Sequence, residues 1–115
     1  MKFLLMMATE EGAWDALPAD EQARIVEQHE KFSDELTSQG KYVWSHRLQD
    51  APNARTVCKV PSGEIQVLDG PYAETKEVVG GIYVIEADSI EEAVEWARKS
   101  HFMPGSTEVR PIWQS

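Results

Sequence analysis

Two segments of the chain are almost entirely apolar. FLLMMA, at residues 3–8, has no polar position, and GIYVIEA, at residues 81–87, has a single acidic residue near its end. Such a run gives no polar face and is typical of a strand that protein covers on both sides. We therefore expect two strands that are buried on both faces.

Helical spacing of apolar residues predicts two helices. The first spans about residues 18–39, because a proline and two acidic residues are typical of a first turn, and Gly40 suits the left-handed position after a helix end. The second begins at Ser89, which has the spacing of a capping box with Glu92, and the Pro-Gly pair at 104–105 closes it.

Alternation of apolar and polar residues predicts further strands. In KYVWSHRL, the even-numbered residues from Tyr42 to Leu48 fall on one face, while Ser45 and Arg47 fall on the other. Residues 107–113 alternate in the same way and predict the last strand.

A hairpin is predicted in the middle of the chain, since residues 55–60 and 64–69 flank a Pro-Ser-Gly turn. The order of elements then fits a ferredoxin-like βαββαβ sandwich of the α+β class with an extra central hairpin, in a single domain over residues 1–115. In that architecture the two apolar strands are neighbours at the sheet centre. Two helices cover one side only, so we expect a homodimer in which a second copy covers the other, as in a dimeric α+β barrel.

The composition narrows the class of partner. The formal net charge is −9 and basic residues occur in no run, so neither nucleic acid nor an anionic membrane surface is an expected partner. The single cysteine cannot form an internal disulfide, and no apolar run approaches the roughly 20 residues that span a bilayer. These features predict a soluble, cytoplasmic protein.

The stretch LDGPYAETKEVVGG, residues 68–81, together with GSTEVRPI near the end of the chain, carries a family resemblance. The chain resembles the YCII-related family, and within it the DGPF branch, with Tyr72 in place of the phenylalanine of the naming motif. The resemblance spans nearly the whole chain and implies a ferredoxin-like dimer with a cavity near the dimer interface.

The resemblance also implies candidate catalytic residues. A His-Asp pair has been proposed as a catalytic dyad in the YCII branch, and its histidine corresponds to His29 in EQHEKF; the aspartate is placed at Asp69. One relative is a dehydrochlorinase of a chlorinated hydroxyquinol, and DGPF genes often adjoin those of extracytoplasmic-function sigma factors. His29 lies at helical spacing from Ile25 and Phe32, so its ring should face inward, where it could equally serve the fold by bonding a backbone carbonyl. Asp69 could likewise be only a turn residue before Gly-Pro.

Three residues are candidates for binding a small anionic ligand. Arg110 on the last strand could hold a carboxylate or pair with Glu108, Lys76 could clamp an acidic group or lie in a solvated turn, and Tyr72 adds a hydroxyl to the loop. The histidines are too far apart in sequence for a metal-ligand spacing, and no cofactor motif is present, so neither a metal nor a cofactor is expected.

Two functions fit these residues. The first is a cofactor-independent enzyme that uses His29 and Asp69 as an acid/base pair for proton transfer in a pocket near the dimer interface. The second is a non-catalytic module that binds a ligand or a regulatory protein such as a sigma factor. The sequence defines neither the substrate nor the partner.

Overall fold

The computed structural model describes residues 1–71 and 76–114 of the chain. The strands and helices follow the predicted order, with one short 3-10 helix before the hairpin. Their bounds are β1 Lys2–Glu10, α1 Ala19–Ser38, β2 Tyr42–Arg47, η1 Ala51–Asn53, β3 Arg55–Lys59, β4 Ile65–Asp69, β5 Glu77–Glu86, α2 Ile90–Lys99 and β6 Ser106–Pro111.

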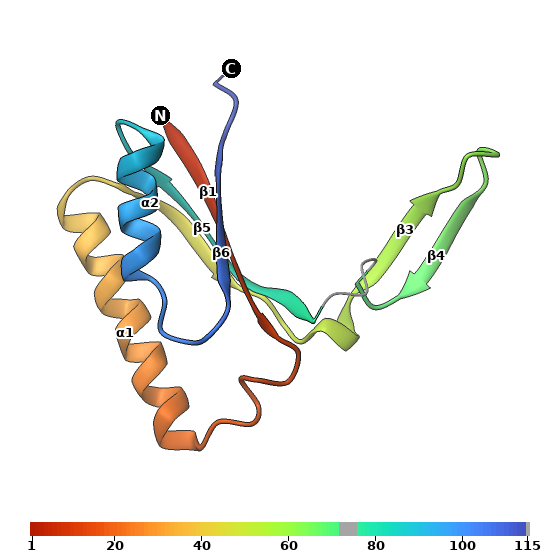
Figure 1. Cartoon of the computed structure of the whole chain (residues 1–115), viewed down its shortest axis with the longest axis horizontal. Helices are drawn as coiled ribbons and strands as arrows, with labels where there is room; N and C mark the ends of the chain where they lie inside the picture. The colour runs from red at the N-terminus through yellow and green to blue at the C-terminus, as the bar shows by residue number, and fades with distance from the viewer. Residues whose placement is uncertain (72–75, 115) are drawn as a thin grey trace.

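The described residues form a four-stranded antiparallel sheet with the order β2-β5-β1-β6. This is the ferredoxin-like α+β arrangement, and β1 and β5 are neighbours at its centre, as the sequence predicted. Both α1 and α2 lie on the same side of the sheet (Figure 1). Within the described ranges, no helix combines the length and the apolar composition that crossing a bilayer requires.

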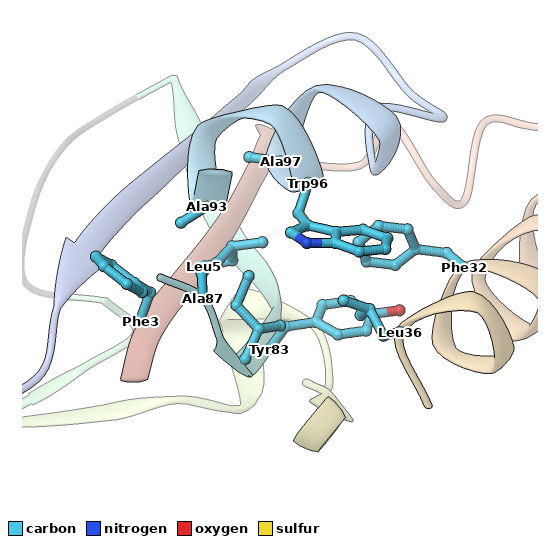
Figure 2. Packing of buried hydrophobic residues seen from close by; sticks show 10 residues of the cluster. Phe3, Leu5, Phe32, Leu36, Tyr83, Ala87, Ala93, Trp96 and Ala97 are labelled. Carbon is cyan, nitrogen blue, oxygen red and sulfur yellow. The ribbon is translucent and has the colours of Figure 1, made fainter. Parts of the chain in front are cut away.

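The core lies between the helices and the sheet. Alternate residues of the central strands face the helices, so Phe3 and Leu5 meet Ile85, and all three are fully buried. Figure 2 shows Phe32 and Leu36 of α1 reaching this layer from one side and three residues of α2 covering it from above. Those three residues are Ala93, Trp96 and Ala97.

The predicted end of α1 and start of α2 are confirmed, whereas α2 ends at Lys99, before the Pro-Gly pair that was expected to close it. Gly40 follows α1 with a left-handed φ of 69°, a conformation in which glycine has no steric penalty. The hydroxyl of Ser89 accepts a hydrogen bond from the backbone N–H of Glu92 at 3.1 Å, which satisfies one of the free donors of the first turn of α2.

One prediction about β2 is wrong. Tyr42 is opposite Ile85 and Trp44 is opposite Val84, so two residues of β2 match one of β5 and the strand bulges at this point. Tyr42 therefore packs against the core, and its hydroxyl bonds that of Ser45 at 2.9 Å, whereas Trp44 lies on the other face.

The hairpin of β3 and β4 forms a separate two-stranded sheet that projects from the main body (Figure 1). Its predicted strands are confirmed. Val57, Ile65 and Val67 lie on one face, and each is between 63% and 67% exposed.

The side of the main sheet that faces away from the helices is apolar as well. Leu4 and Met6 of β1 alternate with the core residues and pair with Val84 and Ile82 of β5. In the single chain the helices cover one face of these strands, as expected. The cover expected on the other face stays a prediction.

Candidate functional site

A cavity of about 690 Å³ lies between α1 and the ends of the central strands. Its lining is largely apolar and includes polar side chains from several elements. Cavities of this size that combine an apolar wall with a few polar groups are typical of small-molecule sites. The polar residues that matter most are His29, Tyr83 and Arg47.

His29 reaches the cavity from the inner face of α1. It lies four residues after Ile25 and three before Phe32, so the helix turns its half-buried ring toward the sheet, as predicted. Its Nδ1 atom is 2.9 Å from the hydroxyl of Tyr83 on β5. The Phe102 ring packs at right angles to the imidazole at a centroid distance of 4.8 Å, so the imidazole is held from two sides.

Burial shifts the titration of both partners toward their neutral forms. It lowers the pKa of His29 below its ordinary value of 6.5, so the imidazole is neutral at pH 7. Burial also raises the pKa of the Tyr83 phenol, against a smaller opposite effect of a hydrogen bond with Ser33. The site therefore holds a neutral imidazole beside a neutral phenol.

The pair can support proton transfer in two arrangements. If the phenol of Tyr83 donates to Nδ1, the His29 ring carries its proton on Nε2 and can donate it. If Nδ1–H donates to the phenol oxygen, the Nε2 lone pair is free to accept a proton. In either arrangement Tyr83 fixes the ring orientation.

The floor of the cavity contains a gap where a side chain would normally be. Thr107, Met7, Gly81 and Arg47 form a row across the sheet on the face that carries Tyr83. Among the described residues, and apart from its two chain neighbours, an added Cβ atom at Gly81 would have one heavy atom within 4 Å, the carbonyl oxygen of His46 at 3.7 Å. The glycine therefore leaves open space beside Tyr83.

The Gly-Gly pair also produces a bulge. Met7 pairs with Gly81 and Ala8 pairs with Val79, so Gly80 has no opposite residue on β1.

Arg47 provides a positive charge at the cavity. Its guanidinium carbon lies 4.4 Å from the centroid of the Trp14 ring, which fixes the side chain by a cation–π contact. Arg47 forms no ion pair with any residue in the described part of the chain.

Asp69 is not brought together with His29 within one chain. It ends β4 on the projecting hairpin, its side chain is 93% exposed, and its carboxylate lies 3.2 Å from the guanidinium of Arg55. It does not line the cavity.

Arg110 and Lys76, two of the three predicted ligand-binding residues, also lie apart from the cavity. Arg110 pairs with Glu108 at 2.6 Å, on the sheet face opposite the helices, which is one of the two roles that the sequence allowed. Lys76 is exposed, and its carbonyl accepts a hydrogen bond from the N–H of Glu11 at 3.3 Å. Tyr72 lies outside the described residues.

Other histidines line the cavity without forming a metal site. His46 and His101 are both among its lining residues. Across residues 1–71 and 76–114, no three His, Cys, Asp or Glu side chains gather in a way that could hold a metal ion.

Sequence reasoning missed Tyr83 and Arg47 as site residues. Tyr83 carries the one hydroxyl in the otherwise apolar stretch IYVI, and a buried hydroxyl needs a partner, which was an available signal. Arg47 gives no comparable signal, because its place at the cavity depends on how β2 pairs with β5.

The fold and this cavity together define a ferredoxin-like α+β protein with a histidine–tyrosine pair in a cavity of small-molecule size. The model of the YCII-related domain matches residues 1–115, and the chain belongs to that family. It is similar to an uncharacterized protein of Rhizobium meliloti (strain 1021), at 33% identity over 97% of this chain and 92% of the relative. The DGPF branch stays a prediction.

Proposed function

We propose that the cavity binds a small, largely apolar molecule and that His29 is its general acid/base. The observation that carries this proposal is the half-buried His29 ring, whose pKa burial lowers and which the Tyr83 hydroxyl holds at 2.9 Å on the wall of a 690 Å³ cavity. A group whose pKa lies near or below the working pH can accept a proton and return it, as eliminations and isomerisations require. Such reactions need no cofactor.

A histidine titration tests the pair that this function needs. In wild type, NMR should give a His29 pKa below 6.5, because burial disfavours the imidazolium. Tyr83→Phe should move that pKa and thereby report the hydrogen-bond direction: upward if the phenol donates to Nδ1, downward if it accepts. Tyr42→Phe also removes a hydroxyl, but one that bonds Ser45 and not His29, so this variant should leave the pKa of His29 unchanged.

The proposed His29–Tyr83 pair is contradicted if Tyr83→Phe moves the pKa of His29 no more than Tyr42→Phe does.

Asp69→Asn in the same series tests the dyad implied by the family resemblance. A carboxylate beside His29 favours the imidazolium, so its loss should lower the pKa of the ring further. An unchanged value removes Asp69 from the site and leaves the role of Tyr83 intact.

Catalysis can be separated from binding before the substrate is known. Small apolar molecules that bind the cavity would be incubated in D₂O, and carbon-bound deuterium would be followed by NMR. An acid/base site should catalyse exchange at an acidic C–H of some ligand in wild type, and His29→Gln should lose the exchange while retaining most of the binding. Ligands that bind without any exchange, with or without His29, identify a binding module instead.

We propose further that two copies of the chain pair through the apolar sheet face and the hairpin. A two-stranded hairpin is at best marginally stable alone, yet this one exposes Val57, Ile65 and Val67 on one face. A twofold arrangement lets each hairpin contact the partner and gives both apolar faces a cover. In this proposal any role of Asp69 at His29 depends on the hairpin of the second copy.

Light scattering after gel filtration tests the dimer. Wild type should elute with about twice the chain mass of 13.0 kDa, and Val67→Glu should shift the population toward monomer because it places a charge in the contact. Gln66→Glu adds the same charge on the opposite face of the hairpin and should remain dimeric. A wild-type chain that is monomeric at high micromolar concentration would overturn the proposal.

A further inference from the structure

We infer that the ligand of this cavity is a small monocarboxylic acid with an apolar body, and that Arg47 anchors its carboxylate. The inference rests on the proposed function, because it names the ligand class of the same cavity. It assigns the anion-binding role to a residue of β2 instead of Arg110 or Lys76.

Arg47 stands apart from the other arginines of the chain. Arg24, Arg55, Arg98 and Arg110 each form a salt bridge with a carboxylate. Arg47 forms none with a described residue and instead lies against the Trp14 ring at 4.4 Å. A cation–π contact uses no N–H group in a carboxylate hydrogen bond, so the planar edge of this guanidinium can match a carboxylate with two parallel hydrogen bonds.

The strand pairing places the backbone of Arg47 close to that of Tyr83, and the side chains of Arg47, Tyr83 and His29 line the same cavity. Arg47 lies opposite Gly81, and Tyr83 follows two residues along β5, which is about 6.6 Å of strand. Met7 is the neighbour of Gly81 on β1, and Gly81 has no side chain to fill the gap. A carboxylate at Arg47 would therefore extend its apolar body over the Gly81 gap and bring its far end to His29.

The negative charge around the cavity argues against a ligand that carries two or more negative charges. Exposed acidic residues occur around the cavity, among them Glu10, Asp15, Glu30 and Asp34, and the chain as a whole carries −9. A phosphate ester or a nucleotide would bring two or more negative charges to a single arginine inside this field. One carboxylate matches one guanidinium.

Matched ligands test the inference directly. Arylalkanoic acids with one to four methylenes would be compared with their neutral amides and with the corresponding amines, by calorimetry or NMR. The acids should bind wild type more tightly than the amides, and Arg47→Met should weaken the acids about tenfold or more, because it removes charge-assisted hydrogen bonds. The amides should bind both proteins alike. Arg110→Met changes the net charge by the same amount outside the cavity and should leave acid binding unchanged.

The outcomes separate this inference from the proposed function. If amides or amines bind wild type and perturb His29 as well as the acids do, or if Arg47→Met matches wild type, the ligand class is wrong and the cavity still binds small molecules. If no member of the panel binds at millimolar concentration, both proposals fall. Arg47→Lys keeps the charge without the planar edge, so recovery of only part of the affinity would support the two-bond contact.

Discussion

Replacing Phe32 with alanine is expected to destabilise the fold by about 3–5 kcal/mol, the usual cost of removing a buried aromatic ring. Phe32 is only 3% exposed. Its ring packs edge-on against Tyr83 at 5.2 Å, Trp96 at 6.1 Å and Phe102 at 6.4 Å. Its loss would leave a cavity between α1, α2 and the sheet that these neighbours can close only by moving.

The same substitution should disturb the candidate site, because two of the three rings that surround Phe32 are those that hold His29. Urea unfolding gives the free energy, and the His29 titration in the folded variant reports the site. Val94→Ala, a truncation on α2 at a side chain that is 36% exposed and does not line the cavity, should cost less than about 1 kcal/mol and leave the titration unchanged. If Phe32→Ala lost stability while His29 kept its wild-type pKa, the site would be independent of the core.

Local signals explain why most of the fold could be predicted from the sequence. The end of α1 at Gly40 and the start of α2 at Ser89 depend on backbone conformation and capping within a few residues. The central position of β1 and β5 follows from their composition, because a strand without a polar face is disfavoured at a solvated edge.

The face assignment of β2 could not be predicted in the same way. Alternation assigns Tyr42 to the face of Trp44, and it fails because the strand bulges where it pairs with β5. A bulge belongs to the pairing of two strands, which the pattern of one strand does not contain. The position of Arg47 at the cavity is set by this same pairing.

The candidate site was predicted in part. The helical spacing around His29 places its ring on the inner face of α1, and the structure agrees. Asp69 was assigned by family resemblance, and no physical feature of the sequence says that a hairpin residue reaches the helix. The histidine partner within the chain is Tyr83, which lies 54 positions away from His29, and contact at that separation depends on tertiary packing.

Replacing Gly81 with leucine is expected to weaken binding of an arylalkanoic acid about tenfold to hundredfold while the fold keeps its stability. An added side chain would occupy the gap beside Tyr83, so that the side chain and the ligand together would overfill it. Overfilling a packed space costs about 1–3 kcal/mol, and 1.4 kcal/mol is a factor of ten in affinity. Calorimetry with the acid and thermal unfolding of the variant measure the two quantities.

The expected stability follows from the backbone at this position. Gly81 is not among the glycines with positive φ, so its conformation suits any residue. In the part of the chain that the structure describes, the contact of an added Cβ atom would be the His46 carbonyl oxygen, at an ordinary 3.7 Å. In a strand interior, glycine is less favourable than residues with side chains. The fold therefore gives no reason for a glycine here, whereas a cavity that must admit a ligand does.

A graded series makes this argument testable. Gly81→Ala should bind nearly as wild type does, Gly81→Val less well and Gly81→Leu least, while all three unfold at or above the wild-type temperature. Equal binding across the series would mean that the ligand does not lie over Gly81, and the path from Arg47 to His29 would be wrong. A parallel fall in stability and binding would instead assign the glycine to packing.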